Sequence, residues 1–112
     1  FELAEEVRPL ASRARDRKLK PAEMKGGTFS ITNFGAIGGE YATPIINYPE
    51  TAILGLGAIE ERPVARDGEV VAAPTLPLSL SIDHRVIDGA VAAEFANTVI
   101  EHLEHPLLLL SH

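Results

Sequence analysis

Cysteine is absent from these 112 residues, basic residues are outnumbered by acidic ones, and long apolar runs are missing. The lack of cysteine excludes disulfide bonds, thiolate metal ligands and cysteine nucleophiles, and it is compatible with a reducing compartment. The formal net charge of −6 argues against a general nucleic-acid binder, which needs a basic face. No apolar run approaches the ~20 residues that cross a bilayer, so the sequence predicts no membrane span.

The remaining composition is that of a globular chain. Hydrophobic residues make up 46% and charged residues 23% of the sequence. The length of 112 residues is enough for one domain or a piece of one. The only methionine is Met24, and a helical pattern starts at Phe1 without a capping side chain before it. We therefore expect these residues to be part of a longer chain.

Periodicity predicts helices at both ends of the chain and strands between them. Apolar residues recur at helical spacing over about residues 1–17 and 89–104, and Pro106 is expected to end the second helix. Alternation or apolar runs predict strands at 28–33, 51–60 and 76–82, with an Asp67-Gly68 hairpin turn leading into 69–73. This order indicates an α+β fold with a mainly antiparallel or mixed sheet.

Three side chains are candidates for chemistry. His84 stands where a strand gives way to a loop and a helix, and an imidazole there can accept and return a proton near neutral pH. Thr32 lies at a strand end on the polar face, where its hydroxyl could donate a hydrogen bond to an oxyanion. Asp88 precedes the second helix as an N-cap, and its carboxylate could also fix the His84 loop. By position alone, ordinary structural roles account for all three.

Other motifs are incomplete. The pattern Gly55-Leu56-Gly57 begins a dinucleotide-binding fingerprint, but Glu60 stands where the third glycine belongs. Ser79 and Ser81 lack the flanking glycines of a hydrolase elbow, and His84 with Asp88 supplies only two ligands for a metal. We therefore expect no metal site.

Three sequence blocks carry a family resemblance. The segment from Asp83 to Gly89 (DHRVIDG) matches the HxxxDG signature of the chloramphenicol acetyltransferase-like superfamily. Together with the blocks 26–35 and 44–55, in this order and spacing, it resembles the dihydrolipoamide acyltransferases of 2-oxo acid dehydrogenase complexes. The resemblance covers nearly the whole chain and implies the C-terminal part, residues 1–112, of one acyltransferase domain with the chloramphenicol acetyltransferase-like fold.

This resemblance implies a reaction and roles for particular residues. The family moves an acyl group between a dihydrolipoyl thiol, carried on a separate domain, and coenzyme A. His84 falls on the general base, Asp88 on the loop-fixing carboxylate, and Thr32 on the oxyanion donor, where many relatives carry serine. The resemblance also places Thr32, Asn33, Gly57 and Ile59 along the coenzyme A channel.

The same resemblance implies partners and missing parts. Relatives carry lipoyl and subunit-binding domains and an earlier part of the catalytic domain, so this fragment alone is expected to be inactive. They form homotrimers that assemble into larger cores, bind decarboxylase and dihydrolipoamide dehydrogenase components, and place the active site between subunits. The implied location is the cytoplasm, or the mitochondrial matrix as the less favoured choice.

Two other functions remain open from the sequence. One is another HxxxDG acyltransferase, such as a free-standing acetyltransferase or a peptide-synthetase condensation domain. The other is a non-catalytic assembly module that keeps the core scaffold without turnover. The acyl group, whether acetyl, branched-chain or succinyl, also stays open.

Overall fold

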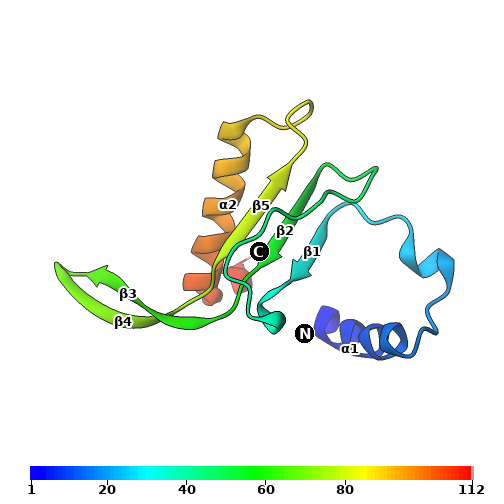
Figure 1. Cartoon of the computed structure of the whole chain (residues 1–112), viewed down its shortest axis with the longest axis horizontal. Helices are drawn as coiled ribbons and strands as arrows, with labels where there is room; N and C mark the ends of the chain where they lie inside the picture. Colours follow the sequence, from blue (N-terminus) through cyan, green and yellow to red (C-terminus); the bar gives the residue numbers. More distant parts are fainter. Residues whose placement is uncertain (112) are drawn as a thin grey trace.

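The computed structural model describes residues 1–111, and Figure 1 shows a small sheet with one helix behind it, a projecting hairpin and a second helix to the side. The elements are α1 (Glu2–Arg15), η1 (Pro21–Met24), β1 (Ser30–Asn33), η2 (Gly35–Ile37), β2 (Ala52–Leu56), β3 (Glu60–Arg66), β4 (Glu69–Thr75), β5 (Leu78–Ile82), α2 (Gly89–Glu104) and η3 (Pro106–Ser111), where η marks short 3-10 helices. The predicted α+β class is confirmed.

The central sheet is mixed and has the order β1-β2-β5. β1 runs parallel to β2, and β5 runs antiparallel to β2. In this register Thr32 lies beside Gly55 and Gly55 beside Ser79, so these three residues share one face of the sheet. That face carries the hydroxyl side chains of β1 and β5 with Ile53 between them, whereas the opposite face carries apolar residues such as Leu54 and Leu80.

Each face of the sheet has its own cover. On the apolar face lies α2, which shares a small apolar cavity with β5 and β2, and whose Phe95 ring lies 5.4 Å from that of Phe29. On the hydroxyl face lies the connection of residues 34–51, in which the Ala42 N–H donates to Ser79 Oγ at 3.3 Å. Figure 1 shows this connection in front of the sheet and α2 behind it.

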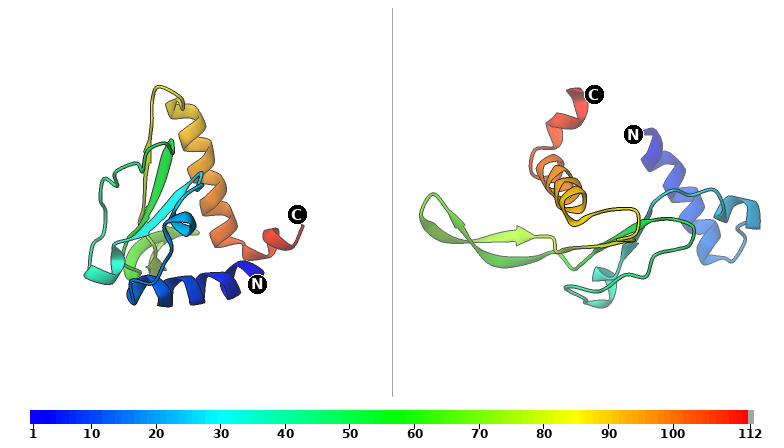
Figure 2. Two further views of the ribbon diagram at one scale, coloured as in Figure 1. Left: turned by 90° about the vertical axis from the view of Figure 1, so that its right-hand side faces the viewer. Right: turned by 90° about the horizontal axis from the view of Figure 1, so that it is seen from above.

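The hairpin of β3 and β4 extends away from the sheet (Figure 2). Its turn residues Asp67 and Gly68 have φ angles of 50° and 80°, as the predicted two-residue hairpin turn requires. The single strand predicted over 51–60 is wrong, because β2 ends at Leu56 and β3 begins at Glu60. The Gly57 N–H donates to the Pro77 carbonyl and adds one last bond to the β2–β5 ladder, but Pro77 has no N–H to donate in return. The Ala58 N–H donates instead to Gly39 in the 34–51 connection, so the chain leaves the sheet here.

The first helix ends two residues before its predicted end, because Arg17 adopts a left-handed φ of 56°. An ion pair between Arg13 and Glu23, 2.8 Å long, ties α1 to η1. The apolar face of α1 stays exposed, with Leu3 78% and Val7 59% accessible. Figure 2 shows α1 lying apart from the sheet, so nothing in the described chain covers this face.

The core of the described chain is small. Its buried apolar residues are Ala52, Ile53, Leu54 and Ala73. The radius of gyration is 16.4 Å, whereas a compact chain of this length has about 13 Å. The accessible surface is 9157 Å², about 3000 Å² more than a compact 12 kDa protein exposes. Such an excess is typical of a chain that is completed by further protein.

Candidate active site

The loop that carries His84 begins where β5 leaves the sheet. The Asp83 N–H donates to the Thr51 carbonyl at 2.8 Å and so extends the β2–β5 ladder by one residue. The Asp83 carbonyl in turn accepts from the N–H groups of Val86 and Ile87 at 3.0 and 2.9 Å, which closes a tight turn. His84 is exposed at the tip of this turn, one residue beyond the last sheet contact.

An ion pair braces the turn from its two flanks. Arg85 donates its N–H and its Nε to Asp83 Oδ1 at 3.1 and 2.9 Å, and its Nη2 to Oδ2 at 2.8 Å. These hydrogen bonds from Arg85 lower the pKa of Asp83 to about 2, and the same contact raises the pKa of Arg85. His84 is therefore held between two residues that are locked to each other.

Asp88 marks the other end of the loop. Its Oδ1 accepts from the Val91 N–H at 2.9 Å, and its carbonyl accepts from Ala92 at 3.1 Å, which confirms the predicted N-cap of α2. The guanidinium of Arg85 pairs with Asp83, so the ion pair that fixes the loop comes from a residue to which the sequence analysis gave no role. Asp88 contributes its bond to the Val91 backbone N–H at the start of α2.

Thr32 and Asn33 lie at the opposite end of the sheet. Thr32 is half-buried on the hydroxyl face, and Asn33 Oδ1 accepts from the Gly35 N–H at 2.9 Å in the turn that ends β1. Thr32 in β1 is level with Ser79 in β5, two strands away, and Asp83 follows Ser79 by four residues. Asp83 therefore lies about 13 Å from Thr32 along the strands and about 10 Å from it across the sheet. His84 and Thr32 of one chain therefore do not meet.

Gly57 and Ile59, the other predicted channel residues, follow β2. A Cβ on Gly57 would lie 2.1 Å from the Glu40 carbonyl oxygen, and one on Gly35 would lie 2.5 Å from the Gly57 carbonyl oxygen. Close packing of backbone on backbone thus accounts for these glycines. Ile59 is exposed and lines an open cavity of about 560 Å³ between the hairpin and the end of α2.

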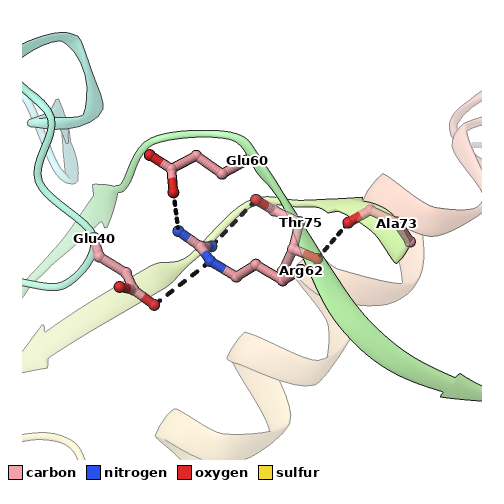
Figure 3. Close-up of polar contacts among 5 residues, drawn as sticks. All are labelled: Glu40, Glu60, Arg62, Ala73 and Thr75. Carbon is pink, nitrogen blue, oxygen red and sulfur yellow. Dashed lines mark hydrogen bonds and ion pairs between the residues drawn. The ribbon is translucent and has the colours of Figure 1, made fainter. Parts of the chain in front are cut away.

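Two polar clusters were not identified from the sequence. In the first, Arg62 lies 3.5 Å from both Glu40 and Glu60 and donates to the Thr75 carbonyl, so it joins the base of the hairpin to the 34–51 connection (Figure 3). In the second, Ser30 and Asn47 both donate to Glu50. Each cluster includes a contact between distant segments, Glu40 with Arg62 in the first and Ser30 with Glu50 in the second, and only the fold brings these together.

Neither a cluster of metal-binding side chains nor a membrane-spanning helix occurs among residues 1–111. This part of the chain holds no group of three or more histidine, aspartate or glutamate side chains suited to a metal ion. Neither of its two α-helices has the length and apolar character needed to cross a bilayer.

The sequence and the fold both match one protein family. The family model described as 2-oxoacid dehydrogenases acyltransferase (catalytic domain) matches residues 1–111, and the chain belongs to this family. The chain is 54% identical over 110 residues to the dihydrolipoyllysine-residue acetyltransferase component of the pyruvate dehydrogenase complex of Bacillus subtilis, covering 98% of this chain and 25% of that protein. The corresponding Staphylococcus aureus (strain N315) component is 52% identical, and the match covers 98% of this chain and 26% of that protein.

Solved structures agree with the sequence relatives. An Azotobacter vinelandii dihydrolipoamide acetyltransferase matches with a TM-score of 0.91 and 45% identity over 97% of this chain and 45% of that one. A probable dihydrolipoamide acetyltransferase from Listeria monocytogenes matches with a TM-score of 0.87 and 39% sequence identity. This match covers 91% of this chain and 44% of the Listeria chain. The chain thus spans about a quarter of the length of these curated relatives and under half of these solved chains. The predicted fold and family are confirmed.

Proposed function

We propose that this chain supplies the C-terminal part of an acetyl-transferring catalytic domain, which moves the acetyl group between dihydrolipoamide and coenzyme A. The identity of over 50% to acetyltransferase components of pyruvate dehydrogenase complexes supports both the reaction and the choice of acetyl. The bacterial origin of these relatives supports a cytoplasmic location. The proposed partners are the decarboxylase and dihydrolipoamide dehydrogenase components of the same complex.

A matching spacing carries the assignment of His84, Thr32 and Asp88. The Azotobacter structure was solved to investigate a serine, a histidine 52 positions later and an asparagine four positions beyond that in the catalytic mechanism. Thr32, His84 and Asp88 have the same spacings. Threonine keeps the hydroxyl donor of serine, and aspartate, like asparagine, can accept the helix N-cap bond.

The proposed mechanism needs one base and one hydrogen-bond donor. The His84 imidazole takes the proton from the coenzyme A thiol, and the thiolate attacks the carbonyl carbon of the S-acetyl dihydrolipoyl group. The Thr32 hydroxyl donates to the tetrahedral oxyanion, which then expels the dihydrolipoyl thiolate. That thiolate takes the proton back from the His84 imidazolium, so the enzyme returns to its starting state. The reverse transfer follows the same steps.

The separation of His84 from Thr32 supports an active site shared between two copies, in which one copy gives the base and the next gives the donor. The surplus accessible surface of the single chain supports extensive contact with further protein. A homotrimer that builds into a larger core is the proposed assembly, and a solved relative is the cubic core of a pyruvate dehydrogenase complex. Asn33, Gly57 and Ile59 remain proposed channel residues for coenzyme A.

Replacing His84 in the intact protein tests the proposal. We expect His84→Ala to lower the rate of acetyl transfer from acetyl-coenzyme A to dihydrolipoamide by about 10²- to 10⁴-fold. His105→Ala, an exposed histidine at the end of α2, is the matched control and should leave the rate unchanged. Full activity of His84→Ala would show that His84 is not the base, whereas a wild-type protein without transfer activity would favour the scaffold module.

Mixing two inactive variants tests whether the site is shared. Copies with His84→Ala and copies with Thr32→Ala are unfolded and reassembled together, and some sites then combine an intact His84 with an intact Thr32. Random mixing should restore roughly a quarter of the wild-type rate. A mixture no more active than either variant alone would contradict the shared site.

A further inference from the structure

Glu50 is a half-buried carboxylate just before β2, at the same end of the sheet as the His84 turn. Ser30 Oγ donates to its Oε1 at 2.6 Å, and Asn47 Nδ2 donates to its Oε2 at 3.3 Å. The Glu50 N–H also donates to the Asn47 carbonyl at 2.8 Å, so residues 47–50 close into a turn. Since both carboxylate oxygens already accept bonds from the protein, this group is suited to hold structure rather than to transfer protons.

The next residue links this turn to the proposed base. The Thr51 carbonyl accepts from the Asp83 N–H at 2.8 Å, and Asp83 immediately precedes His84. Asp83 then carries the whole turn, because its carbonyl accepts from Val86 and its carboxylate binds Arg85. The position of the Thr51 carbonyl therefore sets where the His84 turn begins.

The Glu50 carboxylate supplies a contact that the strand ladder lacks. β1 and β2 pair from Ser30 and Ile53 onward, so residues 50 and 51 lie beyond the first pair. The bond of 2.6 Å between the Ser30 hydroxyl and an ionised carboxylate is short and charge-assisted, about twice as strong as a neutral one. It holds the end of β2 from the β1 side, while Asp83 holds it from the β5 side.

We propose that Glu50 is a positioning residue for His84. Its carboxylate, bound by Ser30 and Asn47, fixes the Thr51 carbonyl on which the His84 turn is built. This inference rests on the proposed function of His84 as the base. A displacement of about 1 Å at a catalytic group can cost about 100-fold in rate, so loss of this brace should appear in kcat.

Two substitutions in the intact protein test the brace directly. We expect Glu50→Ala to lower kcat by about 10- to 100-fold with little change in KM, because the substrates still bind while the base is displaced. Glu50→Gln keeps one carbonyl acceptor for Ser30 and should recover part of the loss. Glu61→Gln, an exposed glutamate on the hairpin, is the matched control and should leave kcat unchanged.

A double-mutant cycle separates positioning from general structural damage. If Glu50 acts through His84, Glu50→Ala should cause no further loss of kcat in a His84→Ala background. An equal loss in both backgrounds, or no loss in the wild-type background, would overturn the inference. Failure of the proposed function would look different, because His84→Ala alone would then leave kcat unchanged.

Ser30→Ala keeps the cycle informative should Glu50→Ala fail to assemble. It removes only the donor of the 2.6 Å bond, and we expect a loss of kcat of about 10-fold that also disappears in the His84→Ala background. Ser30→Thr restores a hydroxyl and should restore most of the rate. An unchanged kcat in Ser30→Ala would count against the brace.

Discussion

The two helices of this chain have similar sequence patterns and different surroundings. α2 starts with a side-chain cap from Asp88 and lies on the apolar face of the sheet, where Phe95 meets Phe29. α1 starts without a side-chain cap, and its apolar residues face open space within the described chain. An amphipathic pattern therefore specifies a helix and the face it offers, whereas burial depends on whether another element is there to receive that face.

The sheet beneath α2 should respond most strongly to mutation. Leu54 in β2 is only 6% exposed, so Leu54→Ala should lower the free energy of unfolding by about 3 kcal/mol, through lost burial and the cavity left behind. Urea unfolding of the intact protein measures this loss. Leu54→Met, which nearly conserves volume, is the matched control and should cost less than about 1.5 kcal/mol. A loss for Leu54→Ala as small as the one for Leu54→Met would show that the region beneath α2 tolerates cavities.

Substitutions at two glycines compare the crowded end of β2 with the open start of α2. Gly57→Ala should cost about 2 kcal/mol, because the new Cβ meets the Glu40 backbone, which cannot rotate away. Gly89→Ala, at the first residue of α2 with nothing within 4 Å of the added Cβ, should be neutral or stabilise by about 0.5 kcal/mol. Thermal unfolding of both variants measures this difference in stability. A Gly57→Ala variant as stable as the wild type would contradict the prediction.

The cap of α2 gives a smaller effect and probes the main difference between the helices. Asp88→Ala should lower the free energy of unfolding by about 1 kcal/mol, because the Val91 N–H loses its acceptor. Asp88→Asn keeps an acceptor oxygen and should lose far less. Denaturant unfolding of the two variants measures the difference, and equal losses would show that the cap bond does not matter.

The Asp83–Arg85 pair should give the smallest effect, visible as a change with pH. Contact with Arg85 holds the pKa of Asp83 at about 2 instead of the ordinary 3.8, so the pair stabilises the fold above about pH 4. That contribution falls as the pH drops through 2, because the folded carboxylate then becomes protonated. In Arg85→Gln, NMR titration should return the pKa of Asp83 toward 3.8. A pKa that stays near 2 would show another cause.

Much of the fold was predictable because its signals are local. The period of the apolar residues predicted both helices, Asp67-Gly68 predicted the hairpin turn, and Asp88 predicted the cap of α2. The single strand predicted over 51–60 was wrong because the ladder ends where Gly57 meets Pro77, which has no N–H, and where Ala58 donates to Gly39 instead; no local pattern reveals these partners. The HxxxDG motif identified His84 and Asp88 as site candidates, the wider family resemblance added Thr32, and the roles of all three stay predictions.

The sequence by itself determined the helices, the tight turns and the residues that the HxxxDG motif singles out, because each depends on neighbours a few positions apart. It also determined the family, because three motif blocks occur in a fixed order and spacing along the chain. Only the tertiary structure decided that His84 and Thr32 stand at opposite ends of one sheet. It also decided that Glu50 meets Ser30 and that α1 is left uncovered. Those relations come from strand register and from packing between distant segments, which are set when the whole chain is folded and not by any local stretch of residues.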